Sequence, residues 1–125
     1  GTAFGDVDLD GDVDILLTND NGPAELLLNE APKSGNSAVI DVRGPDGAPA
    51  LGATVRATLS DGRAITRTAR IDGSYFSSSS PIIHMTWPEG TRVVDYTVNR
   101  PGGTAKLTRA GLEPGERTTV VLGSN

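Results

Sequence analysis

Five aspartates occupy every second position from Asp6 to Asp14, within the stretch GDVDLDGDVDILLTND that starts at Gly5. Carboxylates this close repel one another, and no basic residue lies near them in the sequence to offset their charge. Such a segment either stays disordered because of its charge or folds around a cation. What the first part of the chain can fold into depends on which of these holds.

The alternation favours a cation, because it matches the first half of an oxygen cage for Ca²⁺, an ion that takes about six to eight oxygen ligands. Magnesium fits less well, since its tight octahedron is usually completed by waters and few carboxylates. Gly11 would permit the sharp reversal that wraps the chain around the ion. The alternative without metal is an acidic, solvated loop. The predicted ligands are the side chains of Asp6, Asp8 and Asp10, the backbone carbonyl of Asp12, and Asp14, which closes the site.

The loop is not an EF-hand. An EF-hand needs a bidentate glutamate at its twelfth position, and counting from Asp6 that position holds Leu17. The residues that follow the loop are Val13, Ile15, Leu16 and Leu17, which indicate a buried strand rather than a helix. The sequence therefore predicts a calcium loop flanked by strands.

The net charge of −5 comes from this loop alone. Without its five aspartates, eleven acidic residues face eleven Lys and Arg, so the remainder is neutral. Neither a basic nucleic-acid footprint nor a cationic membrane helix is present, and no apolar run could span a bilayer. The absence of cysteine excludes disulfides, thiol catalysis and zinc–thiolate sites.

Most of the chain reads as short strands separated by turns. Val55 and Ala57 alternate with Thr54, Arg56 and Thr58, which is typical of a half-buried strand. With 16 Gly and 8 Pro supplying turns, we predict an all-β protein: an antiparallel β-sandwich or open barrel, preceded by a β-hairpin that carries the calcium loop. The expected strands are residues 13–18, 26–29, 38–43, 53–59, 65–71, 82–87, 92–98, 104–108 and 117–122.

The composition changes at Ala31-Pro32-Lys33-Ser34-Gly35-Asn36, which reads as a linker. We therefore divide the chain into an acidic part at residues 1–32, a linker at 33–36, and a β domain at 37–125. Strands separated from the rest of a sheet leave unpaired edges, so homo-oligomer formation or exchange of the first hairpin is an expected outcome.

The stretch FGDVDLDGDVDILLTND, followed by Leu26-Leu27-Leu28-Asn29, resembles part of an FG-GAP/VCBS repeat, the calcium-bearing blade unit of integrin-like propellers. The resemblance implies metal-binding roles for the five aspartates. A propeller needs several four-stranded blades. We therefore expect the chain to be the C-terminal piece of a longer protein, with a partial propeller blade at its start.

From Asn36 onward the chain resembles the ASPIC/UnbV domain, which commonly follows FG-GAP/VCBS repeats, as in cartilage acidic protein homologues and enediyne-biosynthesis proteins. The matching residues are Leu51-Gly52-Ala53-Thr54-Val55, Asp61-Gly62, Asp72-Gly73-Ser74-Tyr75-Phe76-Ser77, His84, Val93 to Val98, and Pro101-Gly102-Gly103. Of the adjacent Tyr75 and Phe76, one would face the core if they lay in a strand, and the other would be exposed.

No catalytic or cofactor-binding residue is predicted. The serines at residues 77–80 and the single histidine, His84, do not form a plausible hydrolase triad, because Pro81 separates them and no acid lies close in sequence. A packed histidine beside a polar loop is the better interpretation.

Two functions fit these observations. The first is a non-catalytic, calcium-stabilised module for recognition or scaffolding, with a protein or carbohydrate ligand and without nucleic-acid binding or membrane insertion. The second is an enzyme or accessory protein of natural-product biosynthesis of the enediyne type, in which the metal acts as a Lewis acid. An open coordination position that faces a pocket would favour the enzyme. Weak calcium sites suit calcium-rich surroundings, so an extracellular or periplasmic location is expected, as in a secreted bacterial protein.

Overall fold

The computed structural model describes residues 1–102 and 106–123 of the 125-residue chain. Turns and loops connect its ten strands, and the described residues contain no helix. The described part of the chain thus offers no helix of the length and apolarity needed to cross a membrane. The strands are β1 (Thr2–Gly5), β2 (Asp14–Leu17), β3 (Glu25–Leu27), β4 (Asn36–Arg43), β5 (Thr54–Leu59), β6 (Ala64–Thr68), β7 (Ile83–Trp87), β8 (Val93–Asn99), β9 (Lys106–Leu112) and β10 (Arg117–Val121).

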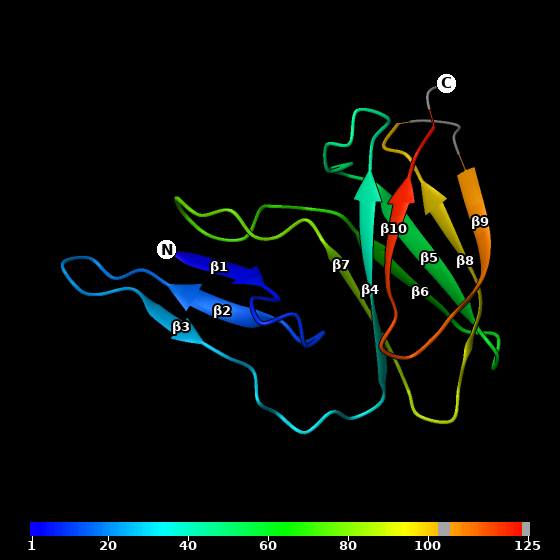
Figure 1. Cartoon of the computed structure of the whole chain (residues 1–125), viewed down its shortest axis with the longest axis horizontal. Helices are drawn as coiled ribbons and strands as arrows, with labels where there is room; N and C mark the ends of the chain where they lie inside the picture. Colours follow the sequence, from blue (N-terminus) through cyan, green and yellow to red (C-terminus); the bar gives the residue numbers. More distant parts are fainter. Residues whose placement is uncertain (103–105, 124–125) are drawn as a thin grey trace.

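These strands form three sheets (Figure 1). β1, β2 and β3 make a three-stranded antiparallel sheet beside the rest of the molecule. The other strands form two sheets, in the orders β10-β4-β7 and β6-β5-β8-β9, which enclose one apolar core. The predicted all-β class is confirmed, and the arrangement is that of a β-sandwich rather than a closed barrel.

One strand pair departs from the predicted antiparallel arrangement. β10 runs parallel to β4, with Arg117 beside Val39. After β9, in the opposite sheet, the chain turns at residues 113–116, where the Gly115 amide donates a hydrogen bond to the Ser37 carbonyl (2.7 Å). β10 therefore enters the sheet from the end at which β4 begins, and this entry point fixes the parallel direction.

The core lies between the two sheets of the sandwich and consists mainly of aliphatic side chains. In β5, Val55 and Ala57 are fully buried and Arg56 between them is exposed, which confirms the predicted alternation. Trp87 and Tyr96 are the aromatic members of the same buried cluster. Removing this apolar surface from water, at roughly 25 cal/mol per Å², holds the two sheets together.

The predicted strands correspond to β2 through β10, but β1 is missing from the prediction. Its sequence, TAFG, contains a single large apolar side chain, Phe4, and gives no alternating pattern. Its ladder partner is β2, so a long-range contact rather than local propensity defines it. Gly103, residues 104 and 105, and residues 124 and 125 of the predicted β domain lie outside the described residues.

The serine run at residues 77–80 lies along the outer edge of β1. The Ser80 amide donates to the Phe4 carbonyl (2.8 Å), and the Ser77 hydroxyl donates to the Thr2 carbonyl (2.5 Å). The Phe4 amide donates in return to the Ser79 hydroxyl (3.3 Å). This segment therefore covers the β1 edge of the first sheet, while β3 forms its other edge, and the predicted homo-oligomer stays a prediction.

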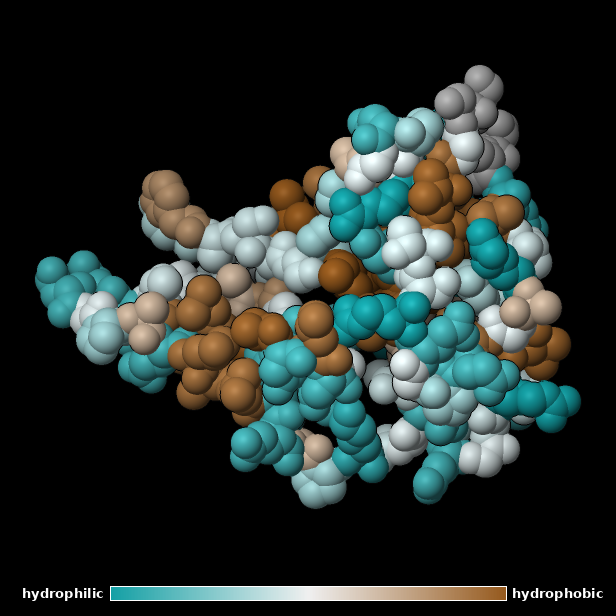
Figure 2. All heavy atoms as spheres, in the orientation of Figure 1, coloured by the Kyte–Doolittle hydropathy of each residue, from teal (hydrophilic) through white to brown (hydrophobic). Residues whose placement is uncertain are grey.

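Tyr75 and Phe76 lie in the loop between β6 and β7, which projects at the upper left of Figure 2. They are 82% and 91% exposed, and their rings meet edge to face with centroids 4.4 Å apart. Neither ring faces the core, because the pair does not lie in a strand and the condition for that expectation is not met. Phe76 has a φ of 51° and turns the chain instead.

Ile40 and Ile71 offer a matched test of where the core lies, because they are 0% and 38% exposed. We expect Ile40→Ala to lower the free energy of unfolding by about 2–5 kcal/mol, through lost apolar burial and the cavity left behind. Ile71→Ala should lower the free energy of unfolding by much less. Urea unfolding followed by circular dichroism measures both, and equal losses would contradict this account of the core.

Candidate metal centre

The aspartate loop connects β1 to β2 and reverses sharply between them. Gly11 has a φ of 98°, the left-handed conformation that a glycine adopts readily at a sharp reversal, and Leu9 has a φ of 64°. Two aspartates also support the turn itself: Asp8 Oδ1 accepts the Asp10 amide (3.3 Å), and Asp10 Oδ1 accepts the Asp12 amide (2.9 Å). The loop thus holds its carboxylates close together despite their mutual repulsion.

Three of the five aspartates converge. Asp6, Asp8 and Asp14 each offer a carboxylate oxygen, and these oxygens all lie within 4.8 Å of one another. Two oxygens that bind one Ca²⁺ at about 2.4 Å can be at most about 4.8 Å apart, so the spacing fits a shared calcium ion. The sequence predicted these three residues as ligands, and the fold brings them together.

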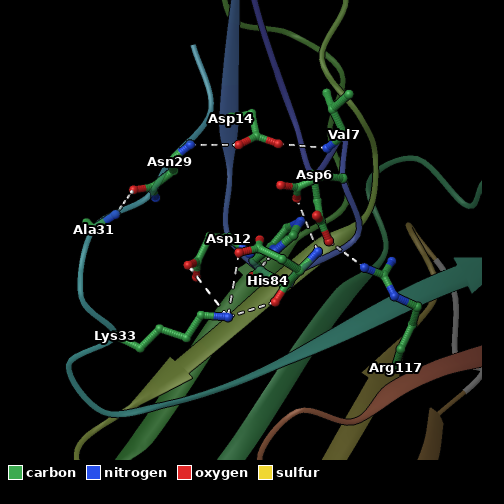
Figure 3. A network of polar contacts seen from close by, with 12 residues as sticks. Asp6, Val7, Asp12, Asp14, Asn29, Ala31, Lys33, His84 and Arg117 are labelled. Carbon is green, nitrogen blue, oxygen red and sulfur yellow. Dashed lines mark hydrogen bonds and ion pairs between the residues drawn. The ribbon is translucent and has the colours of Figure 1, made fainter. Parts of the chain in front are cut away.

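Asp14 is fixed by backbone amides on both sides (Figure 3). Its Oδ1 accepts the Asn29 amide (2.9 Å) and its Oδ2 accepts the Val7 amide (2.8 Å), while the residue is only 2% exposed. The hydrogen bond from Asn29, followed by that from Val7, lowers the pKa of Asp14 below its usual value. Asp14 is therefore held ionised at the start of β2, and it joins the aspartate loop to the chain that leaves β3.

The side chain of Asp6 is buried, and only one of its two carboxylate oxygens has a hydrogen-bond partner among the described residues. Its side chain is 2% exposed, and its Oδ2 accepts a hydrogen bond from the Arg117 guanidinium. Its Oδ1 is buried without a hydrogen-bond partner among the described residues. A buried carboxylate oxygen in this state is costly, so it marks the position where a positive charge would stabilise the loop most.

Asp10 and Asp12 lie outside the converging group. Their carboxylates face Lys33, with Nζ–Oδ2 distances of 3.8 and 3.7 Å, and Lys33 also donates to the Asp10 carbonyl (2.8 Å). The side chain of Lys33 is half-exposed, so these ion pairs contribute little stability. The predicted metal-binding roles of Asp10 and of the Asp12 carbonyl stay predictions.

Sequence reasoning missed the contacts that the loop makes with distant residues. His84 Nδ1 lies 3.2 Å from the Gly11 carbonyl, a hydrogen bond in the tautomer with its proton on Nδ1. Arg117 reaches Asp6 from β10, and Asn29 reaches Asp14 from the end of β3. Lys33 had a local signal, as a lone lysine in the linker, whereas Arg117 is 111 residues away from its partner.

A surface cavity of about 320 Å³ lies between the loop and the sandwich. Its lining includes Asp10, Gly11 and Lys33 on one side, and Glu116 and Arg117 on the other. The three converging carboxylates do not line it. This cavity therefore does not face the candidate cation position.

The sequence profile of the ASPIC and UnbV family matches residues 44–122. The chain belongs to this family. Among proteins of curated function, none matches the chain. The match to ASPIC and UnbV covers β5 to β10, and it includes both His84 and Arg117 but not the five aspartates of the loop. The ASPIC and UnbV part of the chain therefore supplies two of the groups that contact the aspartate loop.

Asp14→Asn tests the structural role of the buried carboxylate separately from any metal. In asparagine an NH₂ group replaces one of the two carboxylate oxygens, so one of the two backbone amides loses its hydrogen-bond acceptor. We expect the free energy of unfolding, measured with urea in the presence of a chelator, to fall by about 1–3 kcal/mol.

The matched control is Asp20→Asn, at an exposed turn position. It should change the free energy of unfolding by less than about 0.5 kcal/mol. Equal effects of the two substitutions would contradict the role given to Asp14.

Proposed function

We propose that the chain is a calcium-stabilised, non-catalytic binding or scaffolding module at the C-terminal end of a propeller-type protein. The observation that carries this proposal is the convergence of Asp6, Asp8 and Asp14, together with a buried oxygen of Asp6 that has no partner among the described residues. An acidic cluster alone is common on protein surfaces. A carboxylate that is 98% buried and unpaired at one oxygen is not.

The charge balance of the loop supports a divalent ion. Arg117 and Lys33 are the two basic side chains that form ion pairs with the aspartates of the loop in the described part of the chain. The five negative charges of the loop and these two positive charges leave a net charge of −3. A divalent cation would reduce this excess to a single charge.

The donor set points to calcium. All the converging groups are carboxylate oxygens, which hard cations prefer, while softer transition metals favour nitrogen or sulfur ligands. Asp6, Asp8 and Asp14 would hold the ion, with Asp10 and the Asp12 carbonyl as further predicted ligands. The ion would offset most of the negative charge of the loop and fix its shape. Calcium at a site of this kind suits an extracellular or periplasmic protein, for which dissociation constants of about 10⁻⁴–10⁻³ M are typical.

The three-stranded sheet supports the place proposed for the module, next to propeller blades. Its register puts Phe4, Ile15 and Leu27 side by side, and puts Leu16 and Leu26 together on the opposite face. Both faces are therefore apolar, and Figure 2 shows apolar side chains gathered over this sheet. Strands that are apolar on both faces are typical of sheets covered by other layers on both sides. Neighbouring blades of the FG-GAP/VCBS kind would provide such layers.

A non-catalytic role is supported by the cavity beside the loop. Lewis-acid chemistry would need the ion to face a substrate site. The 320 Å³ cavity is lined by Asp10 and Gly11 but by none of the three converging carboxylates. Its mixed lining of Lys33, Glu116 and Arg117 is better suited to holding a polar ligand than to presenting one to the metal.

Calcium titration calorimetry tests this proposal. We expect the wild-type chain, freed of metal by a chelating resin, to bind one Ca²⁺ and to bind Mg²⁺ more weakly. Asp8→Asn should weaken calcium binding at least tenfold, because it removes a charged ligand that contributes little to the folded core. Asp20→Asn, outside the cluster, should bind like the wild type. Absence of calcium binding by the folded wild-type chain would refute the proposal.

A further inference from the structure

We infer that Arg117 couples the cation site to the sandwich. In this arrangement Asp6 is shared, with one oxygen bound to Arg117 and the other facing the cation, so that calcium binding ties the three-stranded sheet to the ASPIC and UnbV domain. This inference rests on the proposed calcium site, and it adds a positioning residue that no motif in the sequence indicates.

The two oxygens of Asp6 are in different environments. Oδ2 is held by the Arg117 guanidinium, and Oδ1 is buried without a partner among the residues that the structure describes. An arginine on one oxygen fixes the orientation of the whole carboxylate. Because Oδ2 is bound by Arg117, Oδ1 is the oxygen left for a cation shared with Asp8 and Asp14, whose carboxylates lie close to that of Asp6.

Arg117 is itself held rigidly by the sandwich. It is the first residue of β10 and pairs with Val39 of β4. The Val39 amide donates a hydrogen bond to the carbonyl of Glu116, the residue before Arg117 (2.8 Å). Val120, also in β10, is fully buried in the core. A shift of Asp6 is therefore transmitted to a strand that the core holds in place.

The other contacts between the loop and the rest of the chain have a different character. His84 lies against the backbone carbonyl of Gly11, and Lys33 comes from the linker rather than from the sandwich. Among the described residues, the Arg117–Asp6 pair is the ion pair that joins the sandwich to one of the three converging carboxylates. Coupling of calcium binding to the sandwich is therefore assigned to Arg117.

The single tryptophan reports on the sandwich alone. Trp87 lies at the end of β7, is buried in the core, and belongs to a different sheet from the aspartate loop. Its fluorescence during heating gives the melting temperature of the sandwich. A ligand that binds the ordered loop raises this temperature only if loop and sandwich unfold together.

The test compares Arg117→Gln with Arg109→Gln, an exposed arginine of β9. Calorimetry first gives the calcium dissociation constant of each protein. Melting is then measured at a calcium concentration of about one hundred times that constant, so that differences in affinity do not contribute to the rise in melting temperature. We expect calcium to raise the Trp87 melting temperature of the wild type and of Arg109→Gln. In Arg117→Gln the rise should fall to less than half.

An unchanged rise in Arg117→Gln overturns the inference. If this variant does not fold, Arg117→Lys decides instead: it keeps the charge but loses the guanidinium, and it too should show a reduced rise. Wild-type protein that binds calcium without any rise in the Trp87 melting temperature refutes the coupling and leaves the calcium site intact. Wild-type protein that does not bind calcium refutes the proposed function itself.

Discussion

A carboxylate buried with one oxygen unpaired is the constraint on which the rest of this structure depends. Asp6 is bound by Arg117 at one oxygen, and its carboxylate converges with those of Asp8 and Asp14. Burying charge is unfavourable unless it is paired, and like charges at this range raise the cost further. The converging carboxylates, the unpaired oxygen and the excess negative charge each support the proposed hard divalent cation.

That constraint lies at the junction of two structural parts. The three-stranded sheet has apolar residues on both faces and little core of its own, whereas the sandwich encloses the main core. In the described part of the chain, three sets of contacts join them besides the linker: the serine run along β1, His84 against Gly11, and Arg117 against Asp6. The first two involve backbone groups of β1 and the loop, and the third is an ion pair to a carboxylate of the proposed cation site. The ASPIC and UnbV domain thus contributes directly to the surroundings of the aspartate loop.

Local patterns predicted much of this arrangement. The alternation in β5, the reversal at Gly11 and the convergence of Asp6, Asp8 and Asp14 could all be read from neighbouring residues. Features that depend on distant partners could not: β1, whose hydrogen bonds come from β2 and the serine run; the parallel entry of β10; and the contact of Arg117 with a residue 111 positions away. Periodicity predicts which face of a strand a side chain occupies, but not which other element covers that face.

The central claim is that a divalent cation orders the aspartate loop, and amide hydrogen exchange between Asp6 and Asp14 tests it most directly. The β5 amides, in the core, serve as an internal reference. With calcium at about ten times its dissociation constant, exchange of the loop amides should slow by about tenfold relative to protein in a chelator. Loop amides that exchange at the same rate in both conditions would contradict the account.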